Sequence, residues 1–303
     1  MISDTNSTTG IGYGKVILLG EHAVVFGHPA VAAGLDATVR AHACPGRGDL
    51  SAPAWQLEAR VGDDSLPGQA IARLLDRLGA KHDAFDFWLE ANVPSRAGLG
   101  SSAAMAVAVA RAVAASSGAD EPSVLEAVAA AESVFHRTPS GIDAAAASRG
   151  CVGRYDKQGG WRDIAAASPF ELCVGISGKL HDTGVLVARV KALCDETPGA
   201  RKLIDTLGDL ARMGAEAVAT GDTAALAHLF NLAHGLLFGI GVSCRELDDM
   251  VYTAREAGAA GAKLTGAGGG GAVIAIAGDH GEEVLRRWRA KGHYGFTTTI
   301  GHA

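Results

Sequence analysis

The sequence predicts an α+β protein of two domains, and three observations lead to this fold class. The chain has 303 residues, enough for two domains of ordinary size. Before Ser101, short apolar or β-branched segments bounded by glycine or proline are typical of strands. After Ser101, long segments carry apolar residues at helical spacing. A loop at residues 168–169 precedes a strand-like segment, so we expect domains at 1–168 and 169–303.

Each expected element is based on its apolar pattern and its flanking turn residues. In the first part of the chain the expected strands are 15–19, 24–26, 37–43, 55–61 and 85–90, with one helix at 68–78. Beyond Ser101 the expected helices are 101–116, 123–137, one that begins at Ser140, 183–194, 200–219, 223–238, 245–257 and 282–291. Further strands are expected at 152–155, 172–176, 272–277 and 295–300. The polar residues 3–9 indicate a short disordered tail.

Charge and composition exclude several classes of protein. With 27 basic and 33 acidic side chains the net charge is −6, and no basic run indicates a nucleic-acid partner. No segment approaches the roughly 18 consecutive apolar residues of a membrane span, and the N-terminus lacks an apolar signal core, so we expect a cytoplasmic protein without a membrane partner. The five cysteines are scattered and form no CxxC pair, which argues against a disulfide framework or a zinc site.

A first glycine-rich segment, PSRAGLGSSAA, runs from Pro94 to Ala104 between an expected strand and an expected helix. A glycine turn at a helix N-terminus presents free N–H groups and the positive end of the helix dipole, which suits phosphate. Serine hydroxyls can bind phosphate oxygens or Mg²⁺. One alternative is a plain serine N-cap. A dinucleotide fingerprint, Gly98-x-Gly100-x-x-Ala103, also fits, but it does not begin a βαβ unit.

Two further glycine-rich segments carry polar side chains. KLTGAGGGG, from Lys263 to Gly271, leads into an expected strand, and its glycines allow close approach of the backbone to a ligand. Its alternative is a flexible linker. In the segment from Gly12 to Ala30, Lys15 opens an apolar strand, and Glu21 and His22 follow at the strand's end between glycines. Three such groups can converge on a polar ligand, or they can be exposed polar residues without a function.

Two carboxylates complete the set of candidate residues. Glu132 continues an apolar stripe of its expected helix, where an unpaired charge is costly, so a metal or a cation is the expected partner. Its alternative is a rim position that reaches solvent. Asp143 follows a Pro-Ser-Gly turn at a helix start. Its alternative is the acid of a Ser-x-x-Asp capping box with Ser140.

Together these segments resemble the motifs of the GHMP kinases, a superfamily whose founding members act on galactose, homoserine, mevalonate and phosphomevalonate. Within it they are most similar to the mevalonate kinase family. The matched motifs are GKxILxGEHxVVxGxPA from Gly14 to Ala30, PxxxGLGSSAA from Pro94 to Ala104, HGxPSGxD from His136 to Asp143, and KLTGAGGGG from Lys263 to Gly271. The resemblance implies a ribosomal-S5-type N-terminal domain and a ferredoxin-like C-terminal domain.

The resemblance also implies an activity: ATP- and Mg²⁺-dependent phosphorylation of the primary alcohol of mevalonate, a step of isoprenoid precursor synthesis. It assigns catalysis to Asp143 as base, with Lys15 beside the substrate hydroxyl, and Mg²⁺ to Ser102 and Glu132. The residues it assigns to the nucleotide are Pro94, Gly98, Leu99, Gly100, Ser101, Ser102, Ala103, Gly266, Gly268 and Gly269. The residues it assigns to the acceptor are Lys15, Glu21, His22, Asp143, His181 and Thr183.

Departures from the family pattern concern the acceptor. Arg137 replaces a glycine, Ala144 replaces an asparagine, and His181 stands where an arginine is expected. The alternatives left open are a GHMP kinase for phosphomevalonate or a sugar-like substrate, and a non-catalytic GHMP relative that binds a ligand. The sequence also leaves open whether the protein is a homodimer.

Overall fold

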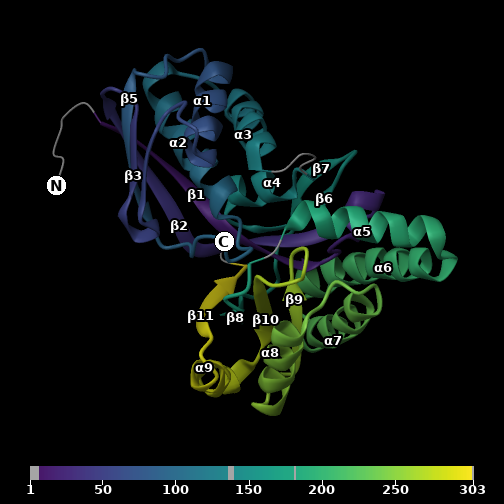
Figure 1. Cartoon of the computed structure of the whole chain (residues 1–303). Coiled ribbons are helices and arrows are strands. Elements are labelled where there is room, and N and C mark those ends of the chain that lie inside the picture. The colour runs from purple at the N-terminus through teal and green to yellow at the C-terminus, as the bar shows by residue number, and fades with distance from the viewer. Residues whose placement is uncertain (1–6, 136–139, 181, 302–303) are drawn as a thin grey trace. The chain divides into compact units, whose positions relative to one another are not determined.

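The computed structural model describes residues 7–135, 140–180 and 182–301 (Figure 1). The chain forms two compact units that interleave along the sequence. The first unit comprises Met1–Gly14, Ala37–Ser95 and Gly100–Gly150, and the second comprises Lys15–Asp36, Arg96–Leu99 and Cys151–Ala303. The strands β1 (Thr8–Leu19) and β2 (Ala30–Pro45) are each divided between the units.

The described residues of the first unit form a sheet and four helices. Its strand order is β4 (Leu57–Arg60), β3 (Asp49–Ala52), β5 (Phe85–Ala91) and the second part of β2. A short 3₁₀ helix, η2 (Pro53–Trp55), connects β3 and β4. The helices are α1 (Leu66–Leu78), α2 (Ser101–Ser117), α3 (Glu121–Phe135) and α4 (Ile142–Arg149). The other three helices all pack against α2, which is therefore central to the unit.

Small residues bring β1 close to α2. A Cβ atom added to Gly10 would lie 2.1 Å from the Ala108 carbonyl oxygen, and one added to Gly12 would lie 2.1 Å from that of Ala104. No side chain fits at either position, so glycine is required for this approach. The alanines and valines of α2 are buried from Ala103 to Ala110. This packing fixes the position of the helix and therefore of its N-terminus.

The second unit contains an antiparallel sheet with the strand order β11 (Tyr294–Ile300), β8 (Phe170–Ile176), β10 (Ala272–Ile276) and β9 (Gly261–Thr265). Its helices are α5 (Thr183–Glu196), α6 (Pro198–Thr220), α7 (Thr223–Gly239), α8 (Arg245–Glu256) and α9 (Gly281–Ala290), with the short 3₁₀ helix η3 (Gly278–His280). Figure 1 shows α7 and α8 beside β9, and both helices pack on that strand. The first part of β2 pairs with β6 (Val152–Asp156), and β6 pairs with β7 (Gly160–Asp163).

Most expected elements are confirmed within a few residues of their bounds. The expected strand at 24–26 is wrong: it is a 3₁₀ helix, η1 (Ala23–Phe26), because Gly20 and Gly27 adopt positive φ on either side and turn the chain tightly. The expected tail is wrong at Thr8 and Thr9, which belong to β1. The apolar pattern of the sequence did not predict the strands β3, β7 and β9. The boundary at residues 168–169 remains a proposal, with β8 beginning directly after it.

None of the helices in the described part of the chain has the length and apolar character needed to cross a bilayer.

Candidate active site

In the second unit, the last part of β1 contacts Gly98 and Leu99 of the first glycine-rich segment. Lys15 is 4% exposed, and its backbone N–H donates to the Leu99 carbonyl oxygen at 2.8 Å. Its ammonium lies 3.4 Å from the Gly98 carbonyl oxygen. Leu99 is completely buried. The sequence-predicted residues Lys15, Gly98 and Leu99 therefore lie together.

The turn after β1 is tight and carries two polar side chains. Gly20 has φ 96° and His22 has φ 60°, an uncommon conformation for a residue with a side chain. The Glu21 carboxylate forms an ion pair with the ammonium of Lys263, and both side chains are 0% exposed. His22 Nε2 lies 2.9 Å from the Ala267 carbonyl oxygen. Consecutive residues of the first motif thus reach the strand and the loop of the third motif.

Burial controls the protonation of these groups. It raises the pKa of the Glu21 carboxyl, and the positive charges of Lys263 and Lys15 oppose this rise. It lowers the pKa of the Lys263 ammonium, against the opposing effect of Glu21. Burial also lowers the pKa of His22, so its imidazole is neutral at pH 7. A carbonyl oxygen only accepts hydrogen bonds, so Nε2 carries the proton and Nδ1 is an acceptor.

The third glycine loop, residues 266–271, is held by backbone contacts. The Gly269 N–H donates to the Val242 carbonyl oxygen at 2.7 Å, and the Gly271 N–H donates to that of Lys179 at 3.1 Å. A Cβ atom on Gly268 would lie 2.1 Å from the Val242 oxygen. In contrast, a Cβ atom on Gly266 would have open space, with the Gly98 oxygen nearest at 3.9 Å. The first and third glycine turns therefore lie side by side at Gly98 and Gly266.

In the first unit, the N-terminus of α2 is capped by no side chain. Its N-cap is Gly100, with φ 73°, so a serine N-cap is not the explanation for this motif. Ser101 and Ser102 open the helix and are half-buried, whereas Ala103 is fully buried. Pro94 is half-buried in the loop that leads to the turn. The first N–H groups of α2 are thus without intrahelical partners, which suits an anion.

The two candidate carboxylates lie on helices that pack against α2. Glu132, on α3, is 2% exposed, so the alternative of a rim position reaching solvent is wrong. Asp143 is half-buried in the first turn of α4. The N-cap of α4 is Gly141, which has no side chain, so Ser140 is not the capping residue of a box with Asp143.

The predicted Mg²⁺ ligands have suitable chemistry. Mg²⁺ prefers oxygen ligands and is usually held by one or two protein groups together with phosphate oxygens and water. A hydroxyl from Ser102 and a carboxylate from the buried Glu132 fit this pattern. No cluster of three or more His, Cys, Asp or Glu side chains that could hold a metal occurs among the described residues.

Of the two predicted acceptor residues at positions 181 and 183, the structure describes only Thr183. His181 lies outside the described residues. Thr183 is the first residue of α5, whose N-cap Asp182 accepts a hydrogen bond from the Val185 N–H at 3.0 Å. Sequence reasoning did not single out Lys263 and Thr265. Both residues lie in β9, and every residue of this strand is buried. A lysine and a threonine in a buried strand are the feature that points to a role.

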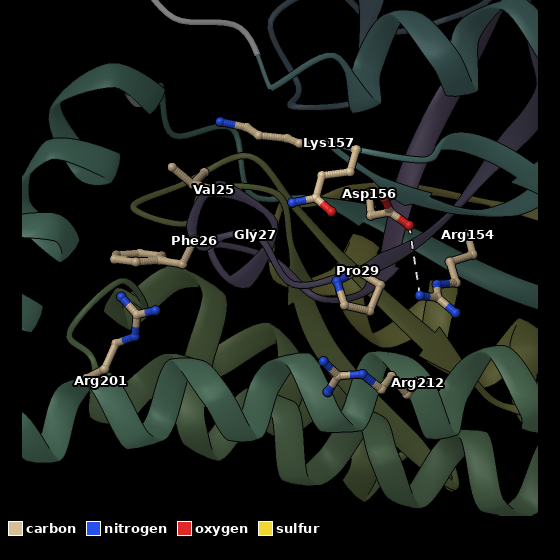
Figure 2. Close-up of a pocket in the computed structure, with 10 residues that line it drawn as sticks. Val25, Phe26, Gly27, Pro29, Arg154, Asp156, Lys157, Arg201 and Arg212 are labelled. Atoms are coloured by element: carbon tan, nitrogen blue, oxygen red, sulfur yellow. Dashed lines mark ion pairs between the residues drawn. The ribbon is translucent and has the colours of Figure 1, made fainter.

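A cavity of about 490 Å³ lies elsewhere in the second unit (Figure 2). Its lining residues are Val25, Phe26, Gly27, Pro29, Arg154, Asp156, Lys157, Gln158, Arg201 and Arg212. Three of its four cations pair with carboxylates: Arg154 with Asp156, Arg201 with Asp205, and Arg212 with Asp209. Its positive charge is therefore largely compensated, and it contains none of the predicted site residues.

Comparison with known proteins identifies the family of this chain. Residues 65–151 match the family described as GHMP kinases N terminal domain, and residues 215–293 match the one described as GHMP kinases C terminal. A mevalonate kinase of Aeropyrum pernix is 35% identical over 288 residues, which cover 87% of this chain and 86% of that protein. The chain belongs to the GHMP kinase family.

Two further relatives place this GHMP kinase beside the mevalonate kinases. The mevalonate kinase of Methanothermobacter thermautotrophicus is 33% identical over 286 residues, covering 91% of this chain and 93% of the relative. The crystal structure of L. major mevalonate kinase in complex with R-mevalonate has a TM-score of 0.87 at 30% identity, covering 99% of this chain and 98% of that one. The expected GHMP kinase fold is confirmed.

Proposed function

We propose that this GHMP kinase transfers the γ-phosphoryl group of ATP to the primary alcohol of mevalonate, giving 5-phosphomevalonate for isoprenoid synthesis. The observation that carries the proposal is the likeness to the L. major enzyme solved with R-mevalonate, which extends over 99% of this chain at 30% identity. The motif residues Lys15, Ser102, Glu132 and Asp143 are all present, which favours an active enzyme over a non-catalytic relative.

The proposed roles follow from the motifs and suit the local geometry. Asp143, half-buried in the first turn of α4, accepts the proton of the alcohol. Lys15 supplies positive charge from a buried position, which favours the alkoxide as it forms. His22 offers Nδ1 as an acceptor for a polar group of the substrate. Catalysis in such a site consists mainly of positioning and charge stabilisation.

The nucleotide is proposed to bind the glycine motifs through backbone N–H groups. The open start of α2 and the space beside Gly266 allow phosphate oxygens to approach the backbone closely. Bound Mg²⁺ would neutralise phosphate charge. Ser102 and Glu132 are the residues proposed to hold it, because they occupy the motif positions and supply a hydroxyl and a carboxylate oxygen, which suit Mg²⁺.

A substrate panel tests the activity. Purified protein is incubated with ATP and Mg²⁺, and ADP release is measured separately with mevalonate, phosphomevalonate, homoserine and galactose. We expect mevalonate to give the highest kcat/KM and the product to be identified as 5-phosphomevalonate by phosphorus NMR. A higher kcat/KM for any of the other three would replace mevalonate as the substrate, and no ADP release with any of them would contradict a kinase acting on these alcohols.

A further inference from the structure

Buried polar contacts join the first motif to the third in the second unit. The Ile17 N–H donates to Thr265 Oγ1 at 2.9 Å, and the Thr265 hydroxyl donates back to the Ile17 carbonyl oxygen at 3.0 Å. Next along the chain come the ion pair between Glu21 and Lys263 and the hydrogen bond from His22 to Ala267. Four contacts therefore connect two segments that are about 240 residues apart in sequence.

The Glu21–Lys263 pair is an unusual way to fill a core. Both side chains are 0% exposed, Lys263 Nζ also donates to the Leu264 carbonyl oxygen at 2.7 Å, and the Phe230 ring centroid lies 5.6 Å from it. Among the described residues, nothing hydrogen-bonds Glu21 Oε2. Taking two charges out of water costs free energy that apolar side chains of similar size would not. Stability alone therefore does not account for the pair.

The pair connects the His22 turn to β9, the strand that leads into the third glycine loop. Glu21 and His22 are neighbours in a turn with little conformational freedom, since Gly20 and His22 both have positive φ. Because Glu21 is paired with Lys263 in β9, we expect a shift of Lys263 to move Glu21 and the adjacent His22. His22 in turn contacts Ala267, inside the loop whose Gly268 and Gly269 are predicted to meet the nucleotide.

We infer that the Glu21–Lys263 pair and the His22–Ala267 hydrogen bond couple acceptor binding to nucleotide binding. This inference rests on the proposed function, in which the His22 turn meets the acceptor and the third glycine loop meets ATP. Ordering the loop around ATP holds the His22 turn in its binding position, so the acceptor then binds more tightly. By linkage, the acceptor strengthens ATP binding by the same factor. Glu21 and Lys263 are positioning residues in this scheme.

Calorimetry measures the coupling directly. The dissociation constant of a non-hydrolysable ATP analogue with Mg²⁺ is determined without and with saturating mevalonate, and the ratio is the coupling factor. We expect a factor within the roughly 5- to 150-fold range of typical coupling between sites. In the double variant Glu21→Gln/Lys263→Met, which removes both charges, we expect the factor to fall to about 1.

A matched control separates coupling from general loss of an ion pair. Arg77 and Glu126 form an exposed pair between α1 and α3, and the variant Arg77→Met/Glu126→Gln removes the same two charges there. It should keep the wild-type coupling factor. Thermal unfolding of each variant checks that it is folded. A folded Glu21→Gln/Lys263→Met variant with the wild-type factor, or a wild-type factor of 1, would overturn the inference.

Amide hydrogen exchange on the unaltered protein tests the inference even if the double variant does not fold. The ATP analogue alone should slow exchange in the His22 turn, residues 20–24, as well as in residues 266–271. If it slows exchange only in residues 266–271, the coupling is wrong. The exchange experiment needs no acceptor, so it tests the coupling separately from the proposed substrate. Failure of mevalonate to bind would contradict the proposed substrate, whereas the exchange result alone decides the coupling.

Discussion

At the scale of single residues, Lys15 and Asp143 are the side chains proposed to carry the proton transfer. Lys15 is 4% exposed beside the Gly98 carbonyl oxygen, and Asp143 occupies the first turn of α4. An ionised carboxylate is a weak base, so Asp143 should matter mainly late in the reaction, when the alcohol proton leaves.

Replacing Asp143 with asparagine should therefore lower kcat by about 10²- to 10⁴-fold, the usual value of general-base catalysis, with ATP affinity little changed. Lys15→Met should also lower kcat. The double variant should lose less than the product of the two single effects, since groups that act as a unit are not additive. Steady-state kcat of the three variants, with folding checked by circular dichroism, tests this. If Asp143→Asn keeps more than about a tenth of the wild-type kcat, Asp143 is not the base.

Glu132→Gln gives a separate prediction about the metal. The amide is a poorer Mg²⁺ ligand than the carboxylate and has nearly the same shape. The Mg²⁺ concentration for half-maximal rate should therefore rise, and kcat at saturating ATP should fall. A Mg²⁺ titration of the rate measures both. Glu126→Gln, an exposed position on the same helix, is the control. An unchanged Mg²⁺ requirement in folded Glu132→Gln would remove Glu132 from the proposed ligands.

At the scale of elements, the glycines of the third loop differ in how much space surrounds the position of a Cβ atom. Gly268 has φ 83° and faces the Val242 carbonyl oxygen, so a larger residue there disturbs the protein itself. Gly266 has φ 87° and open space around its Cβ position. Gly266 is therefore the position at which nucleotide binding can be tested with the least disturbance of packing.

Gly266→Ala should weaken ATP binding more than tenfold, because the methyl group enters the space where phosphate is proposed to approach the backbone. Gly292→Ala is a matched control, with φ 85° and nothing within 4 Å of its Cβ position. Both substitutions place alanine at positive φ, so each should cost about 1 to 2 kcal/mol of unfolding free energy. Calorimetry with the ATP analogue should show the loss only for Gly266→Ala. Equal affinities for the two variants would contradict phosphate contact at Gly266.

The sequence predicts helices and strands well where the apolar periodicity is strong. It predicts them poorly where a turn, or a residue distant in sequence, determines the local structure. The Ala/Val run of α2 and the stripe of α3 are sufficient to predict both helices. The apolar triplet Val24–Phe26 looks like a strand, yet the glycines around it close a 3₁₀ helix. No local pattern shows that Lys263 pairs with Glu21, because the partner is 242 residues away.

At the scale of the whole molecule, both units are built from segments distant in sequence. The strands β1 and β2 each contribute one part to the first unit and one part to the second. A boundary at one point in the chain, as predicted at residues 168–169, therefore does not divide the chain into these units. Local patterns indicate where strands begin and end, but which sheet each strand joins depends on pairing between distant segments.

Buried charge also affects the stability of the whole protein, and His234 is the clearest case. Its side chain is 10% exposed on α7, with Nε2 3.3 Å from an Asp248 oxygen. The Leu264 N–H, in β9, lies 3.4 Å from its Nδ1. Burial, with the nearby charges of Arg255 and Lys263, lowers the pKa of His234 to about 4, although Asp248 opposes this.

We therefore expect acid to destabilise the folded protein through His234. In the unfolded chain the histidine pKa is about 6.5, so between pH 6.5 and 4 the unfolded state binds more protons and stability falls as pH falls. The loss is about 1.4 kcal/mol for each pH unit well inside this window. Urea unfolding between pH 7 and about 5.5, above most carboxylate titration, measures it. His234→Gln should be less stable at pH 7 and should show a flatter profile, whereas His228→Gln, at an exposed position of the same helix, should keep the wild-type slope. A wild-type slope in folded His234→Gln would show that another group causes the acid sensitivity.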